Sequence, residues 1–144
     1  MSLSFYSASV SSYLQTLKAT ASVLEKGRQH AAAQDQNIED LLQLTLHDDM
    51  YPLPFQVISV WHHSLGAIKG MQSGEFGPPP SLGDLDYAGL EALVAEAIEF
   101  LQSQSKDDIN ALEEGKIVFK MGKLEMPFTN NNFLMSFSLP NFYF

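Results

Sequence analysis

Two adjacent histidines, His62 and His63, are the residues best suited to metal or acid–base chemistry. Neighbouring positions of a helix point about 100° apart, so the two imidazoles cannot chelate one metal ion as a pair spaced by four residues does. His62 follows Ile58 by four residues and lies beside an apolar stripe, so it could face the interior as a ligand. The alternative is a half-buried imidazole that hydrogen-bonds to a neighbour.

The segment His47-Asp48-Asp49 offers an imidazole and two carboxylates, which could bind a divalent ion. The same segment precedes a predicted helix, and there Asp48 or Asp49 could instead cap the free N–H groups. His47 and His62 are therefore the candidate metal ligands, for an ion such as zinc or nickel. Because such sites need three or four converging ligands, and the sequence indicates few, we expect no cofactor.

Aromatic residues near the start of one predicted helix and near the end of the chain could line a cavity for a small apolar ligand. Spaces between helices are common ligand sites in bundles. Packing in the core is the alternative for aromatic residues at helical spacing. The candidate ligand-binding residues are Tyr51, Phe55, Gln56, Trp61, Phe137 and Tyr143.

Several kinds of chemistry lack the residues that they need. The chain has no cysteine, no Gly-rich phosphate loop, no Ser-centred elbow and no His-Glu-x-x-His motif, so nucleophilic catalysis has little support. Seventeen Asp and Glu against eight Lys and Arg give a formal charge of −9, which disfavours binding to nucleic acid. No stretch approaches the ~20 apolar residues that span a bilayer. We expect a soluble, cytoplasmic protein that does not bind membranes.

The 144 residues are enough for one domain, which we place at residues 1–144. Apolar residues repeat at steps of three and four in three stretches, which predicts three amphipathic helices. The first extends from Ser4 to about Gln34, and a short helical turn follows at 38–42. The second begins near Pro52 or Pro54, since proline suits a helix start, and stops at 70–74. The third is capped by Asp84 or Asp86 and ends near 104–105.

The period changes after an acidic linker, because residues 117–121 alternate as a strand does. Gly122-Lys123 suits a tight turn, and Leu124–Phe128 is the returning strand, limited to a sheet edge by Pro127. Thr129 could then cap a fourth helix. The Pro/Gly-rich segment 73–83 is predicted to be a stiff connector. The expected fold is thus mainly α, with a short β-hairpin before the fourth helix.

The chain ends in the aromatic segment 140–144, whereas most termini are polar. We therefore expect the fourth helix to be truncated. Such a truncation would leave a groove between the three long helices, through which two copies of the chain could form a homodimer.

Two segments, Asp49-Met-Tyr-Pro-Leu53 and Leu139-Pro-Asn-Phe-Tyr-Phe144, resemble a family of small proteins known only as a domain of unknown function. That family is similar to the DinB/YfiT-like proteins, and the resemblance covers nearly the whole chain. It implies an up-down-down-up four-helix bundle. It also implies a divalent metal held by three histidines, one from the second helix and two from the last. The corresponding second-helix position here is Val60, and the last-helix pair is absent.

We therefore predict a DinB-like bundle that binds a small ligand or a partner chain without an intact metal site. The alternative is a divalent-metal enzyme of the DinB type, such as a thiol-dependent transferase. In that case the metal would rest on His62 or His47, a carboxylate and a C-terminal histidine that this sequence lacks.

Overall fold

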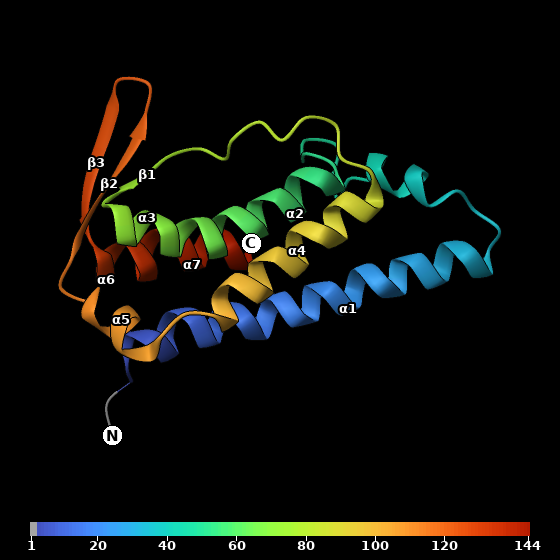
Figure 1. The fold of residues 1–144 in the computed structure, drawn as a ribbon. Coiled ribbons are helices and arrows are strands. Elements are labelled where there is room, and N and C mark those ends of the chain that lie inside the picture. Colours follow the sequence, from blue (N-terminus) through green and yellow to red (C-terminus); the bar gives the residue numbers. More distant parts are fainter. Residues whose placement is uncertain (1–2) are drawn as a thin grey trace.

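The computed structural model describes residues 3–144 as a mainly helical protein with a small three-stranded sheet (Figure 1). The first helix begins with the π-helical segment Ser7–Ser11 and continues as α1, Ser12–Ala33. The Ser4 hydroxyl accepts a hydrogen bond from the Ser7 N–H at 3.1 Å, so the predicted cap is confirmed. Asp35, at φ 52°, follows the end of the helix.

The second helix consists of three consecutive segments. After the 3₁₀ turn Ile38–Gln43, the chain forms α2, Leu53–Trp61, then the π-helical segment His62–Gly66, then α3, Ala67–Ser73. Gly74, at φ 84°, ends the helix because glycine tolerates the left-handed region. Both the proline-rich start and the glycine stop are as predicted.

The third helix is α4, Tyr87–Gln102, and Asp86 caps it by accepting a hydrogen bond from the Gly89 N–H at 2.7 Å. It ends two residues earlier than predicted, because a second short helix, α5, begins at Lys106 and ends at Ala111. We expected only an acidic linker there. Ser105 caps α5 and the buried Ile109 anchors it, while the acidic residues of its first turn suit the positive end of the helix dipole.

The sheet has the strand order β1, β2, β3. The hairpin is confirmed: β2, Lys116–Met121, and β3, Leu124–Thr129, pair antiparallel around Gly122, which lies at φ 61°. Pro127 lies on the edge strand, as expected. The additional strand β1, Glu75–Phe76, pairs parallel with β2. The sequence predicts a connector throughout residues 73–83, but the first part of this segment forms the strand β1. Burial of Phe76 holds this strand against the hairpin.

The last helical stretch begins at Thr129, whose hydroxyl accepts a hydrogen bond from the Asn132 N–H. It comprises α6, Asn130–Phe133, the π-helical segment Leu134–Ser138, and α7, Leu139–Tyr143. Figure 1 shows that α2, α3 and α4 run opposite to α1 and to this last stretch. No helix within residues 3–144 is long and apolar enough to cross a bilayer.

A buried hydroxyl bridge connects the first, second and last helices. Tyr13 and Ser138 share a hydrogen bond of 2.7 Å between their hydroxyls, and the Ser138 hydroxyl donates to the His63 carbonyl at 2.8 Å. Tyr13 and Ser138 are fully buried. Each of the three helices contains a π-helical segment close to this bridge, and such segments often occur at functional sites.

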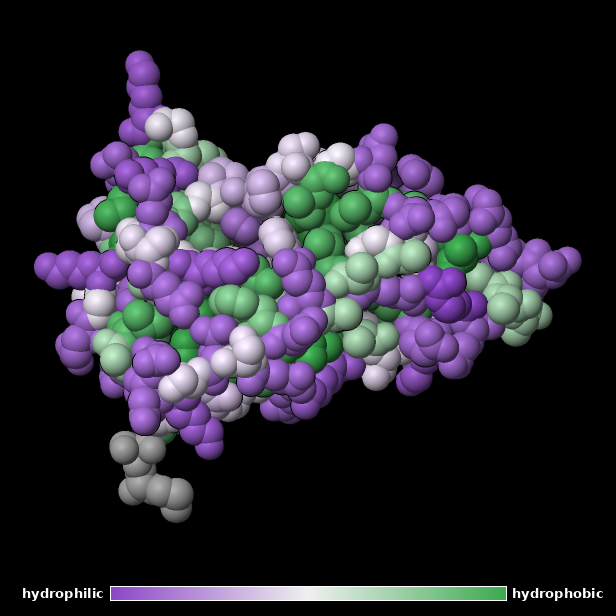
Figure 2. Space-filling view, in the orientation of Figure 1, coloured by the Kyte–Doolittle hydropathy of each residue, from purple (hydrophilic) through white to green (hydrophobic). Residues whose placement is uncertain are grey.

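Apolar residues spaced three and four apart in the first and third helices are buried as predicted, for example Leu17 and Leu90. In the second helix the same spacing predicts an apolar stripe of Phe55, Ile58, Trp61, Leu65 and Ile68. That stripe is wrong at its start, because Phe55 is 41% exposed and Val57 is buried instead. Figure 2 shows hydrophobic side chains reaching the surface over the α2 region, surrounded by hydrophilic ones.

Substitution Ser138→Ala tests the buried bridge. We expect a loss of about 1–3 kcal/mol in the free energy of unfolding, because the buried Tyr13 hydroxyl loses its partner. Denaturant unfolding gives the value. The matched control is Ser136→Ala on the same helix, where the hydroxyl is exposed and the expected change is within about 0.5 kcal/mol. Equal losses in the two variants would contradict a structural role for the bridge.

Candidate functional site

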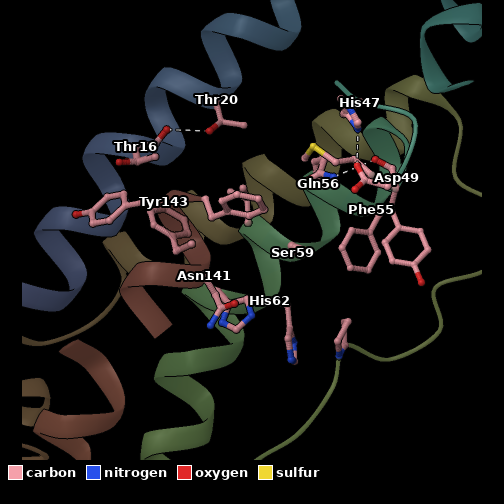
Figure 3. A pocket seen from close by; sticks show the side chains of 17 residues that line it. Thr16, Thr20, His47, Asp49, Phe55, Gln56, Ser59, His62, Asn141 and Tyr143 are labelled. Carbon is pink, nitrogen blue, oxygen red and sulfur yellow. Dashed lines mark hydrogen bonds and ion pairs between the residues drawn. The ribbon is translucent and has the colours of Figure 1, made fainter. Parts of the chain in front are cut away.

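A cleft of about 800 Å³ opens between α1, α2 and α7 (Figure 3). The segment 47–51 before α2 and the strap, which we define as residues 77–85 between β1 and α4, complete its rim. The lining side chains include hydroxyls, amides, histidines, aromatic rings, three apolar non-aromatic groups and one carboxylate. They belong to Thr16, Thr20, His47, Asp49, Met50, Tyr51, Phe55, Gln56, Ser59, Val60, His62, His63, Pro79, Asn141, Phe142, Tyr143 and Phe144.

The aromatic part of the rim is built by Tyr51 and Phe55, whose ring centroids are 4.5 Å apart with a tilt of 37°. Tyr51 is 67% exposed and Tyr143 is 59% exposed, so their faces are open to a ligand. Gln56 donates a hydrogen bond from Nε2 to the Tyr51 carbonyl at 3.0 Å. This bond ties the segment before α2 to the helix itself, and so fixes the position of the rim.

His47 pairs with Asp49 through Nδ1 and Oδ1 at 2.6 Å, and both side chains are largely exposed. The predicted role of Asp48 or Asp49 as a cap of the second helix is wrong. The residue before α2 is Pro52, and no side chain caps the helix there. Asp49 lies too early in the chain for that role and bonds to His47 instead.

His62 is buried and its Nε2 lies 2.7 Å from the Gly77 carbonyl oxygen. A carbonyl only accepts, so Nε2 carries the proton and donates. The ring stacks on Phe76 with centroids 4.4 Å apart. Burial lowers the pKa of His62, which keeps the ring neutral. Of the two predicted roles, the hydrogen bond to a neighbour is the one found, and it holds the strap against α2.

His63 also lines the cleft, although the sequence offered no reason to prefer it to His62. Its Nδ1 is buried and has no hydrogen-bond partner among residues 3–144. The ring packs between Phe76 and Phe137, with centroids 5.6 Å and 5.9 Å away. Burial lowers the pKa of His63 to about 4, so the imidazole is neutral at pH 7.

The structure places four of the six predicted ligand-binding residues on the cleft: Tyr51, Phe55, Gln56 and Tyr143. The other two lie elsewhere. Trp61 faces α4, where its indole N–H donates to Glu96 Oε2 at 3.0 Å. Phe137 packs in an aromatic cluster under the sheet, stacked on Phe133 with centroids 5.5 Å apart. The prediction that all six line one cavity is therefore wrong for these two, because helix rotation directs them to other neighbours.

Sequence comparison matches residues 5–144 to the model of DUF1993, a domain of unknown function. The chain belongs to the DUF1993 family. No curated protein matches it. The structure is similar to the crystal structure of a DinB family member protein from Shewanella denitrificans, with a TM-score of 0.74 and 20% sequence identity. The match covers 96% of this chain and 78% of that one. At this identity the similarity establishes a DinB-like fold.

The donor set in this DUF1993 chain does not fit the metal site that the resemblance implies. Within residues 3–144, no three His, Asp or Glu side chains lie close enough together to hold an ion. His47 and His62 both line the cleft, but Figure 3 shows them apart, with Gln56 and Ser59 between them. The Nε2 atom of His62 already bonds to Gly77. A divalent ion needs three or four converging donors, and His47 and His62 do not form such a set.

Metal content gives a direct test of this donor set. We expect elemental mass spectrometry of the DUF1993 chain, purified without chelators, to find zinc and nickel far below one ion per chain. The His62→Ala and His47→Ala variants are the controls. A stoichiometric ion in the parent chain that either variant loses would overturn the geometric argument.

The lowered pKa of His63 predicts that the free energy of unfolding decreases in acid. Between pH 6.5 and about 4 the unfolded chain takes up a proton at this ring while the folded chain does not, so stability falls as the pH falls. The difference is on the order of 3 kcal/mol, at 1.36 kcal/mol per pKa unit.

Denaturant unfolding at pH 7.5 and pH 4.5 measures this loss in the parent chain and in His63→Leu. We expect the variant to lose less stability on acidification, because its side chain takes up no proton. His30→Leu, which replaces an exposed histidine, is the control and should behave as the parent chain does. The same acid sensitivity in His63→Leu and the parent would rule out the buried ring as its source.

Proposed function

We propose that this DUF1993 protein is an up-down-down-up four-helix bundle that binds a small, largely apolar ligand in the cleft between α1, α2 and α7. The observation that carries the proposal is the open aromatic rim of Tyr51, Phe55 and Tyr143 over a cleft of about 800 Å³. Ligand pockets generally span about 300–1,000 Å³ and combine apolar walls with a few polar groups. This cleft has both features.

The polar groups of the cleft support a specific ligand rather than simple apolar adhesion. Thr16 and Ser59 present hydroxyls from α1 and α2, and Asn141 presents an amide from α7 (Figure 3). They come from three different helices, so they surround the space from several sides. Groups held on helices are better fixed than groups on loops, which suits recognition of one orientation.

The second candidate is the divalent-metal enzyme of the DinB type, for example a thiol-dependent transferase. No donor set within the described part of the chain supports it. Binding is therefore the function that the side chains of the cleft support best.

A second copy of the chain is the competing occupant of the cleft. Exposed aromatic surface of this kind also occurs in protein interfaces. Sedimentation velocity with and without ligand separates the two cases. A dimer that dissociates when ligand is added would assign the aromatic rim to self-association, whereas a monomer under both conditions agrees with a ligand site.

The neutral fluorescent probe N-phenyl-1-naphthylamine tests the proposed function. We expect saturable binding with a Kd of about 10 μM, close to 7 kcal/mol. Substitution Ser59→Trp should weaken binding at least about tenfold, because an indole of ~200 Å² fills the cleft. Ala92→Trp adds the same side chain to an exposed position on α4 and should leave binding unchanged. Equal probe binding by both variants would refute the proposed site.

A further inference from the structure

No lysine or arginine within residues 3–144 lines the cleft, although all eight of the chain lie in that range. The imidazole of His47 on the rim is paired with Asp49. Two of the eight lysines and arginines are engaged elsewhere in ion pairs, Arg28 with Glu91 and Lys120 with Glu75. The ligand therefore meets no positive counter-charge from lysine or arginine, which anionic ligands such as carboxylates and phosphates require.

Each of the two amides of the cleft uses one of its two N–H donors and keeps its oxygen acceptor. Asn141 donates from Nδ2 to the Phe137 carbonyl at 2.7 Å, and Gln56 donates from Nε2 to the Tyr51 carbonyl. Each amide oxygen is free of hydrogen bonds within residues 3–144. An amide oxygen accepts only, so each of these two oxygens can receive a hydrogen bond from a ligand or face a cation.

Asp49 is the only carboxylate among the lining side chains, and one of its two oxygens is already hydrogen-bonded. Oδ1 bonds to His47 at 2.6 Å, which leaves Oδ2 available on the rim. Tyr51 and Phe55 line the same cleft, and their rings are partly exposed. Aromatic faces carry negative potential that attracts ammonium groups, most strongly when a nearby carboxylate adds its charge.

The two histidines His62 and His63 add no positive charge to the cleft. His62 is neutral and donates to Gly77, and His63 is buried among phenylalanine rings in its neutral form. The chain as a whole carries a formal charge of −9, which draws cations toward it over about 10 Å at ordinary ionic strength.

We propose that the ligand of this cleft is an organic cation, an ammonium group carried on an aromatic or alkyl body. The ammonium lies against the Tyr51 and Phe55 faces beside Asp49, and the apolar body enters the cleft toward Val60. This inference rests on the proposed function, because it names the class of ligand for the same cleft.

Phenyltrimethylammonium and tert-butylbenzene form a matched pair for the test, since they share shape and differ in charge. Displacement of N-phenyl-1-naphthylamine measures the affinity of each. We expect the cation to bind about threefold to thirtyfold more tightly than its neutral isostere, the range of a cation–π contact. Benzenesulfonate, an anion with the same ring, should bind more weakly than either.

Two variants locate the source of the charge preference. Asp49→Asn should reduce the ratio of cation affinity to tert-butylbenzene affinity about threefold, because the negative charge at the rim is lost. Glu114→Gln removes the same charge from an exposed position outside the cleft and is the control. Raising the salt from 20 mM to 500 mM should reduce the preference for the cation in the parent chain.

Each outcome separates the two proposals. If tert-butylbenzene binds as tightly as the cation, the charge preference is refuted and the apolar binding site stands. If neither compound displaces a probe whose binding Ser59→Trp weakens, the cation proposal fails and the apolar binding site stands. If the cation binds equally well to Ser59→Trp, it binds outside the cleft, and the inference is overturned.

Discussion

The hydroxyl of Ser138 is the contact on which the arrangement of the helices depends. It bonds to the hydroxyl of Tyr13 and to the carbonyl of His63, and so joins three helices from distant parts of the chain. A buried hydroxyl without a partner is costly, so the helices can approach only in the register that satisfies this group. The cleft opens between α1, α2 and α7.

The strap forms the opposite side of the cleft, and two contacts hold it. β1 pairs with the hairpin strand β2, and the imidazole of His62 donates to the carbonyl of Gly77. A proline-rich segment has few backbone donors of its own, so it depends on such contacts to stay in place. His62 therefore has a clear structural task, and the rim of the cleft depends on it.

The family and fold of the chain do not by themselves define an activity. DUF1993 is a family of unknown function, and the similarity to a DinB family member concerns the fold. Function must be argued from the site, because one fold supports many chemistries. In this site, aromatic faces, amide oxygens and a single side-chain carboxylate occur without a lysine or arginine from residues 3–144, and these features support the proposal of a binding cleft.

The sequence by itself determined the long helices, the caps at Ser4, Asp86 and Thr129, and the hairpin, because these depend on local periodicity and on residues such as Gly74 and Gly122. It also indicated Tyr51, Phe55 and Gln56 as neighbours of a cavity. Only the tertiary structure decided which way Trp61 and the two histidines face, since helix rotation depends on partners distant in the chain. β1 likewise forms only where β2 offers an edge, and no local pattern encodes that pairing.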